Sequence, residues 1–314
     1  MRKISIIVPI YQNALNINKC IESLVKLNKK LNQLGYKLEI ILVEDGSIDN
    51  SYTLLREYLN IEDLAIVKLT RNFGQIPAIQ AGLKYAKGVY IGIISADLQD
   101  PPDLFLKMVP ILESGTKLVI AERKSRDEGY FQRIMSKKYW WLIKKFSMKD
   151  FPAGGFDFCM FDEQVAKEID GINEKNTNIF PLIYWLGFKP KVIKYSRKQR
   201  DEGVSTWTFF NKVKLTIDTI IGFTYLPTRI ISISAILTSI FAFLYFLYIL
   251  IMWYFGYGNS PDGWTTIVLL ILVVGGMILF SLGILGEYLL RILDEVRNRP
   301  NFVIDEVIRK KPSE

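Results

Sequence analysis

The chain has 314 residues, a formal net charge of +8 and a mean hydropathy of +0.18, and 50% of its residues are hydrophobic. It contains no histidine, which excludes histidine as an acid, a base or a metal ligand, and two distant cysteines, Cys20 and Cys159, which do not make a disulfide framework. The basic residues lie mainly beside two long apolar segments, so we expect no nucleic-acid partner.

Strands and helices alternate along the first part of the chain. Apolar runs predict strands at residues 3–8, 38–43, 65–69, 89–94 and 118–121. A helix is predicted between the first two strands from apolar residues at helical spacing, which are Ile17, Ile21, Leu24, Leu27, Leu31 and Leu34, with Gly35 closing it. A second helix should begin after Gly74, with Pro77 in its first turn, and end near Gly88. This alternation predicts an α/β fold with a doubly wound, mostly parallel sheet.

Polar residues follow several of these strands at the point where each ends. The run at residues 89–94 leads into Ser95, Asp97 and Gln99, and the strand at residues 38–43 leads into Asp45 and Gly46. Ligands of open α/β sheets bind at the carboxyl ends of the strands, and oxygen ligands there can hold a hard divalent cation on a diphosphate. Taken alone, the segment at Asp45 also fits an ordinary turn before a helix.

Two apolar segments near the C-terminus, residues 230–254 and 267–286, contain no charged residue, and each is long enough to cross a bilayer. A buried hairpin of a soluble protein is the alternative. Residues 189–229 carry nine Lys or Arg and three Asp or Glu, whereas the loop at 255–263 carries only Asp262. Both termini are therefore predicted to lie in the cytoplasm. Glycines favour close helix packing, within the pair or in a homo-oligomer: Gly275, Gly276, Gly283 and Gly286.

An ordered set of motifs resembles the membrane-anchored family 2 glycosyltransferases of the GT-A fold, such as bactoprenol glucosyltransferases and dolichyl-phosphate mannose synthases. The motifs are Val8-Pro9-Ile10-Tyr11, Glu44-Asp45-Gly46-Ser47, Arg71-Asn72-Phe73-Gly74, residues 96–102 and Leu285-Gly286-Glu287-Tyr288. The resemblance implies inverting transfer of a hexose from a nucleotide sugar, such as UDP-glucose, to polyprenyl (undecaprenyl) phosphate. It also implies Mg²⁺ or Mn²⁺ as cofactor, a place in the inner cell membrane and a lipid-linked sugar for cell-envelope glycans.

The predicted domains follow from the spans and the resemblance. Residues 1–206 form a cytoplasmic GT-A catalytic domain, 207–228 an amphipathic juxtamembrane segment, 229–290 two transmembrane helices and 291–314 a cytoplasmic tail. Apolar and basic residues alternate at residues 131–146 and 207–223, which is typical of helices on an anionic membrane surface. Helices that merely cover or pack on the catalytic domain are the alternative.

The resemblance also assigns site residues. The nucleotide would contact Pro9, Tyr11, Asn13, Asp45, Ser95 and Ala96. Asp97 and Gln99 would hold the metal ion, and the catalytic residues would be Asp97, Asp157 and Arg200. The acceptor phosphate would contact Arg123, Arg133, Ser136, Arg200 and Ser205.

The chain departs from the family pattern at three positions. The family usually has Glu at Asn13, Asp at Ser95 and Lys at Thr206. The loss of an acid at Ser95 motivates one alternative, a nucleotide-binding membrane protein without activity. A processive polysaccharide synthase is another, but such enzymes need more spans and a Gln-x-x-Arg-Trp motif, whereas Arg200 is followed by Asp201.

Overall fold

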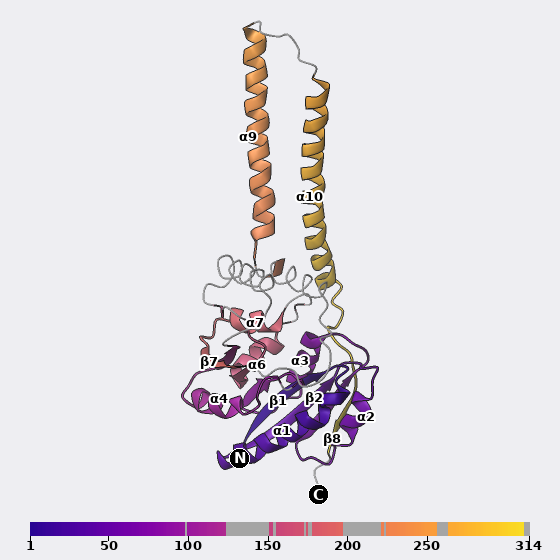
Figure 1. Ribbon diagram of the computed structural model, residues 1–314, viewed down its shortest axis with the longest axis vertical. Coiled ribbons are helices and arrows are strands. Elements are labelled where there is room, and N and C mark those ends of the chain that lie inside the picture. The colour runs from indigo at the N-terminus through magenta and orange to yellow at the C-terminus, as the bar shows by residue number, and fades with distance from the viewer. Residues whose placement is uncertain are drawn as a thin grey trace. The chain divides into compact units, whose positions relative to one another are not determined.

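A computed structural model of the chain describes residues 1–97, 99–123, 151–152, 155–172, 174, 178–196, 221–222, 224–255 and 263–310. Two compact units are present (Figure 1). The first combines Met1–Thr219 with Pro300–Glu314, and the second is Ile220–Arg299. The amphipathic segment predicted at residues 131–146 lies outside the described residues, as does nearly all of the one at 207–223.

The described residues of the first unit form one eight-stranded sheet in the order β7-β5-β6-β4-β1-β2-β3-β8. Its strands are β1 (Arg2–Ile10), β2 (Tyr36–Glu44), β3 (Leu64–Leu69), β4 (Tyr90–Ile93), β5 (Leu118–Arg123), β6 (Cys159–Asp162), β7 (Lys191–Tyr195) and β8 (Ile304–Arg309). β1 pairs in parallel with β2 and β4, β2 with β3, and β5 with β7. β6 runs antiparallel between β4 and β5, and β8 runs antiparallel to β3. The predicted mostly parallel sheet is confirmed.

Six helices accompany this sheet (Figure 1) among the residues described. They are α1 (Ala14–Gln33), α2 (Ser51–Arg56), α3 (Gln75–Leu83), α4 (Leu104–Glu113), α6 (Glu163–Asp170) and α7 (Ile179–Trp185). The predicted apolar stripe of α1 is buried up to Leu31, whereas Leu34 follows the helix and is exposed. Pro77 lies in the first turn of α3 as predicted, and α3 ends at Leu83, before Gly88.

Both faces of the central strands are buried, which explains their apolar runs. Ile4 and Ile6 of β1 share one core cluster with residues of α1 and α4. The neighbouring Ile7 points to the other face, where a Cβ at Gly82 of α3 would lie only 2.5 Å from its side chain. Because successive side chains of a strand point to opposite faces, burial on both faces removes the alternation of apolar and polar residues.

The last residues of the chain return to the sheet. The sequence suggested a tail after the spans, whereas the structure has β8 at the edge beside β3. Lys68 of β3 forms an ion pair with Asp305 at 2.7 Å, and the backbone N–H of Thr70 donates to the carbonyl of Val303 at 3.0 Å. The first unit is therefore built from both ends of the sequence.

The second unit contains two long helices, α9 (Leu226–Tyr254) and α10 (Trp264–Val296). Their stretches Pro227–Tyr245 and Val273–Val296 are long and apolar enough to cross a membrane. The Thr238 hydroxyl of α9 donates to the sulfur of Met277 of α10 at 3.0 Å. A Cβ at any of the four α10 glycines singled out above would meet no described atom within 4 Å. Among the described residues, these glycines do not bring α10 close to α9.

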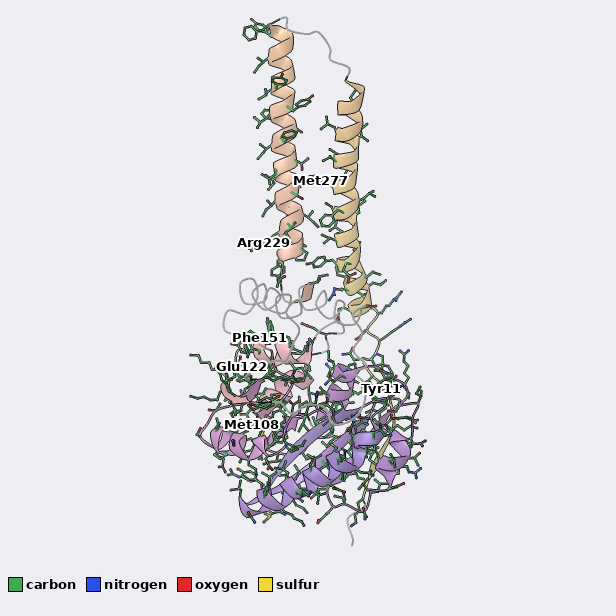
Figure 2. All side chains as sticks on the ribbon, in the orientation of Figure 1. Tyr11, Met108, Glu122, Phe151, Arg229 and Met277 are labelled. Carbon is green, nitrogen blue, oxygen red and sulfur yellow. The ribbon has the colours of Figure 1, made fainter. Side chains whose placement is uncertain are left out.

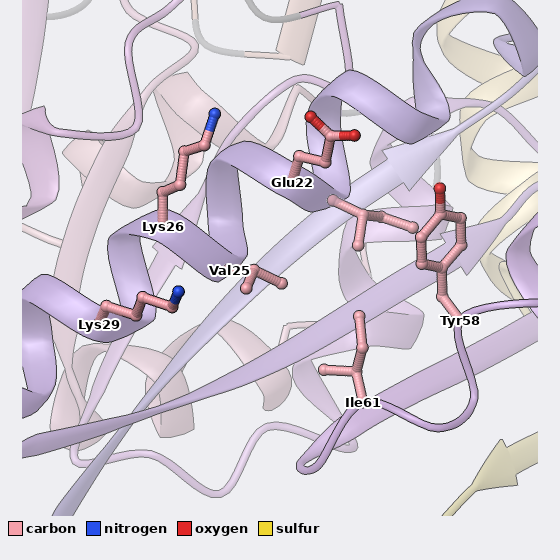
Figure 3. Close-up of a pocket in the computed structure, with 7 residues that line it drawn as sticks. Glu22, Val25, Lys26, Lys29, Tyr58 and Ile61 are labelled. Carbon is pink, nitrogen blue, oxygen red and sulfur yellow. The ribbon is translucent and has the colours of Figure 1, made fainter.

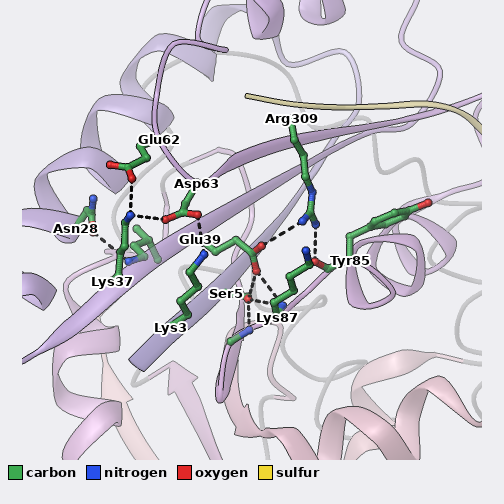
Figure 4. A network of polar contacts seen from close by, with 12 residues as sticks. Lys3, Ser5, Asn28, Lys37, Glu39, Glu62, Asp63, Tyr85, Lys87 and Arg309 are labelled. Carbon is green, nitrogen blue, oxygen red and sulfur yellow. Dashed lines mark hydrogen bonds and ion pairs between the residues drawn. The ribbon is translucent and has the colours of Figure 1, made fainter. Parts of the chain in front are cut away.

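A buried polar network ties β8 to the amino-terminal half of the sheet (Figure 4). The Glu39 side chain is 5% exposed and accepts from the Ser5 hydroxyl at 2.5 Å and from the Lys87 backbone N–H at 2.9 Å. Arg309 of β8 lies 3.7 Å from the second oxygen of Glu39 and donates to the Tyr85 carbonyl at 2.7 Å. Among the residues described, Arg309 is the one cation paired with this carboxylate.

We expect Arg309→Met to destabilise the first unit by about 1–3 kcal/mol, because the buried Glu39 side chain then loses its paired cation. Thermal unfolding of the full chain in detergent would measure this. Lys30→Met is the matched control, since the Lys30–Asp103 pair is exposed and such pairs contribute little. Equal effects of both variants would contradict the role given to Arg309.

Candidate functional site

The carboxyl ends of the parallel strands bring most of the predicted site residues to one edge of the sheet. The segments that leave β1, β2 and β4 there are residues 11–13, 45–47 and 95–97. Arg123 ends β5 at the same edge. Asp157 joins them because it precedes β6, which runs in the opposite direction. Segments that are far apart in the sequence therefore surround one surface.

Hydrogen bonds fix the loop after β1 against the loop after β2. The Gln12 N–H donates to the Ser47 hydroxyl at 3.0 Å, and the Asn13 N–H donates to the Ser51 hydroxyl at 3.0 Å. The Asn13 side-chain oxygen accepts from the Asn16 amide at 2.7 Å. Asn13 stands where the family has an acid. Its side-chain oxygen is thus hydrogen-bonded to Asn16 in the first turn of α1.

Tyr11 and Pro9 are the remaining predicted residues of this first segment. Pro9 is partly buried in β1, and Tyr11 is 36% exposed just beyond the end of the strand (Figure 2). The tyrosine ring can therefore contact a ligand at the sheet edge, whereas the proline contributes the shape of the surface beneath it. Their role in binding a nucleotide stays a prediction.

Asp45 holds the loop that follows β3. Its side chain is buried, and its two oxygens accept hydrogen bonds from the backbone N–H groups of Phe73 and Gly74, each at 2.8 Å. Burial raises the pKa of the Asp45 carboxyl to about 6, although these two amide hydrogen bonds act in the opposite direction. The structure thus gives Asp45 a structural contact that sequence reasoning, which assigned it to base and ribose, did not foresee.

Gly46, in the loop after β2, allows the loop after β3 to come close to it. Its φ is +64°, and a Cβ placed on it would lie 2.4 Å from the backbone of Arg71 and of Asn72. Only glycine fits such a contact without displacing the backbone. The exposed Arg71 guanidinium lies 4.7 Å from the centroid of the Phe73 ring. Arg71 was part of a family motif but was not chosen as a site residue, and its place beside Gly46 makes it a further candidate.

Asp97 and Gln99 follow β4 in a turn. The Gln99 N–H donates to an Asp97 carboxylate oxygen at 3.3 Å, and Asp97 is 9% exposed. Ser95 is partly buried and Ala96 is fully buried at the start of this turn. In the described part of the chain, no three acidic or thiol side chains gather to enclose a cation. The Asp97 carboxylate and the Gln99 side-chain amide are oxygen donors that suit a hard cation, and such a cation would take its further ligands from water and a substrate.

Cys20 of α1 lies close enough to Asp97 to sense its charge. Burial, with a smaller contribution from Asp97, raises the pKa of the Cys20 thiol to about 12. Metal ligation by cysteine requires the thiolate. Burial thus disfavours the Cys20 thiolate, and the oxygen donors of Asp97 and Gln99 are the stronger candidates.

Arg123 and Asp157 form an ion pair at the other side of this edge. Burial alone would lower the pKa of the Arg123 guanidinium, but the charge of Asp157 and contacts with Tyr195 and Asp100 raise it above its ordinary value. Arg123 is therefore a fixed cation. The other predicted acceptor residues lie outside the described residues: Arg133, Ser136, Arg200 and Ser205.

A separate groove lies along α1 and contains none of the predicted site residues (Figure 3). Its lining residues are Ile21, Glu22, Val25, Lys26, Lys29, Tyr58 and Ile61. The groove combines apolar side chains with the charged Glu22, Lys26 and Lys29, and its lining contains no cluster of carboxylates that could bind a cation. The chemistry-bearing residues are therefore at the sheet edge and not in this groove.

Replacing Gly46 tests how the two loops meet. We expect Gly46→Ala to destabilise the chain by about 1–3 kcal/mol and to speed amide hydrogen exchange at residues 71–74, because the added Cβ meets their backbone. Gly115→Ala is the control, since its φ is +94° and a Cβ there meets nothing within 4 Å. Faster exchange at residues 71–74 in the control as well, or in neither variant, would contradict the contact.

Known proteins are similar to this chain over nearly its whole length. The glycosyltransferase YkcC of Bacillus subtilis, called uncharacterized, is 34% identical over 304 residues, which cover 96% of this chain and 93% of the relative. A prophage-derived bactoprenol glucosyl transferase of Shigella flexneri is 30% identical, with 99% and 100% covered. An undecaprenyl-phosphate 4-deoxy-4-formamido-L-arabinose transferase of Proteus mirabilis is 30% identical, with 100% and 96% covered.

The fold also matches a solved structure. Mannosyl-3-phosphoglycerate synthase from Rubrobacter xylanophilus superposes with a TM-score of 0.50 at 15% identity, covering 69% of this chain and 71% of that protein. This similarity concerns the fold alone, and it agrees with the expected GT-A arrangement of sheet and helices. Residues 5–166 match glycosyl transferase family 2. With this match and the full-length relatives, the chain belongs to glycosyl transferase family 2.

Proposed function

We propose that this glycosyltransferase moves a hexose from a nucleotide sugar, UDP-glucose or a similar UDP-sugar, to polyprenyl (undecaprenyl) phosphate with inversion at the anomeric carbon. The observation that carries the proposal is the single sheet edge that presents the segments of Asp45, Asp97 and Asp157, in a chain that continues into two apolar helices. The names of the Shigella and Proteus relatives, a bactoprenol glucosyl transferase and an undecaprenyl-phosphate transferase, support a polyprenyl-phosphate acceptor.

The donor nucleotide would bind across the loops after β1, β2 and β4. Tyr11 offers an exposed ring, and the partly buried Ser95 offers a hydroxyl at the same edge. Arg71 adds a cation next to these loops. The base and ribose would lie among Pro9, Tyr11, Asn13, Asp45, Ser95 and Ala96.

Asp97 and Gln99 would hold a divalent cation, Mg²⁺ or Mn²⁺, because carboxylate and amide oxygens suit such ions and leave places for diphosphate oxygens. When bound, the cation offsets the negative charge that develops on the departing nucleoside diphosphate. Ser95 supplies no carboxylate where the family usually has one. Asp97 is therefore the one carboxylate of the two proposed cation ligands.

The acceptor needs little help from a base. A phosphomonoester has a second pKa of about 6, so near neutral pH its oxygen can attack the anomeric carbon directly. Arg123, held by its ion pair with Asp157, would attract this phosphate with the N–H donors of its guanidinium. Asp157 would orient the sugar or help to hold the metal ion, rather than remove a proton. Further phosphate contacts would come from Arg133, Ser136, Arg200 and Ser205.

The membrane arrangement is also a proposal. The catalytic unit and both termini would lie on the cytoplasmic side, where nucleotide sugars are present, and α9 and α10 would span the inner membrane. The excess of basic residues before α9, against Asp262 alone between the helices, supports this orientation. Close packing through Gly275 and Gly283 would join copies of the chain.

A transfer assay tests the proposed reaction. Purified full chain, incubated with undecaprenyl phosphate and a panel of UDP- and GDP-sugars, should give one hexosyl lipid by mass spectrometry, formed from a UDP-sugar. Asp97→Asn and EDTA should each lower the rate by about 100-fold or more, because charge stabilisation of the leaving group is lost. Asp103→Asn is the control, since that exposed acid pairs only with Lys30 in the contacts described.

Different outcomes contradict different parts of this proposal. Full activity in EDTA would overturn the cation at Asp97 and Gln99. No product from any donor would overturn transfer to polyprenyl phosphate and would favour a nucleotide-binding membrane protein without activity.

Thiol labelling tests the orientation. In intact cells, a membrane-impermeant thiol reagent should label Asn259→Cys and should leave Ser313→Cys unlabelled. The native Cys20 and Cys159 are buried, and burial raises the pKa of both thiols, so they should give no background. The opposite labelling pattern would place the catalytic unit outside and contradict the use of cytoplasmic nucleotide sugars.

A further inference from the structure

Four polar side chains lie next to one another across the candidate site as two bonded pairs, which the register of β5 and β7 brings together. The Tyr195 hydroxyl, at the end of β7, donates to a carboxylate oxygen of Asp100. Arg123, at the end of β5, is the register partner of Tyr195 on the neighbouring β7, and its guanidinium forms an ion pair with Asp157. Asp100 lies three residues after Asp97, so the two pairs run from the proposed cation segment to the proposed acceptor side.

The exposure of these side chains increases from one end to the other. Asp100 is 1% and Tyr195 is 5% exposed, whereas the Arg123 and Asp157 side chains are 16% and 36% exposed. The inner end is an anchor, because a buried carboxylate is costly unless it is hydrogen-bonded. The outer end presents a cation and a carboxylate at the sheet edge.

Tyr195 is suited to join the two halves. A neutral phenol has one donor and two acceptor positions, so it can donate to Asp100 and accept from Arg123 at the same time. Burial, and next the charge of Asp100, raise the pKa of Tyr195 above its ordinary value, which keeps the phenol neutral. Its ring lies 6.4 Å from the ring of Phe158, which in turn lies 4.6 Å from the ring of Phe105. The ring is therefore held in the core independently of its hydroxyl.

We propose that Tyr195 is a positioning residue that fixes the Arg123–Asp157 pair relative to the segment of Asp97 and Gln99. This rests on the proposed function, in which one side holds the sugar diphosphate and the other the acceptor phosphate. Transfer requires the attacking oxygen and the anomeric carbon to lie about 3–3.5 Å apart and in line, and a displacement of about 1 Å can cost about 100-fold in rate. Tyr195 acts through its neighbours and does not touch the reacting atoms.

The test is Tyr195→Phe in the full chain, which keeps the packed ring and removes the hydroxyl that donates to Asp100. We expect kcat, expressed per nucleotide-binding site, to fall by about 10- to 100-fold, while the Kd for UDP changes by less than about threefold. Tyr58→Phe is the matched control, because its hydroxyl bonds to Asn18 on an exposed surface at 3.0 Å and it should behave like the parent. Asp100→Asn, which can still accept from Tyr195, should retain more activity than Tyr195→Phe.

The possible outcomes separate this proposal from the function on which it rests. A parent that transfers sugar and a Tyr195→Phe variant with the same kcat would overturn the positioning role alone. A variant that loses UDP binding together with kcat would make Tyr195 a residue required for folding, which also overturns the role. A parent that transfers nothing to polyprenyl phosphate would overturn the proposed function and this inference together.

Discussion

The common direction of β1, β2, β4 and β5 is the constraint on which the site depends. Because these strands are parallel, or aligned through the antiparallel β6, their carboxyl ends meet at one edge. Hydrogen bonds then fix the loops at that edge, with Asp45 holding the backbone of the loop after β3. The strands that carry these loops are buried on both faces, so packing in the core holds the strand ends in place.

Part of this arrangement could be predicted from the sequence. The five expected strands agree with β1 to β5 within two residues at each end, because strands buried on both faces have long apolar runs. β6 has only four residues, and β7 carries lysines at its exposed edge. β8 pairs with β3 across more than 230 residues. Such short or charged strands are stabilised by their neighbours, and no local pattern reveals them.

Some residues of the candidate site could likewise be predicted from the sequence, and others could not. Asp97, Gln99 and Asp157 could be singled out because acids after apolar runs, and family motifs, mark them in the sequence. The contact of Tyr195 with Asp100 could not, since it needs the neighbourhood of β5 and β7. The return of β8 to the sheet could not be predicted either. Through β8, the first unit includes residues that follow the second apolar helix. A fragment that ends before α9 would lack the Arg309 contact with Glu39.

Hydrogen exchange on the full chain in detergent, with and without UDP and Mn²⁺, tests most directly whether these loops form one nucleotide site. Exchange should slow at residues 11–13, 45–47, 71–74 and 95–99, which the sheet brings to one edge. It should not change near Tyr58 and Ile61, which line the separate groove on α1. Protection confined to that groove, or unchanged exchange at all four loops, would contradict a nucleotide site at the sheet edge.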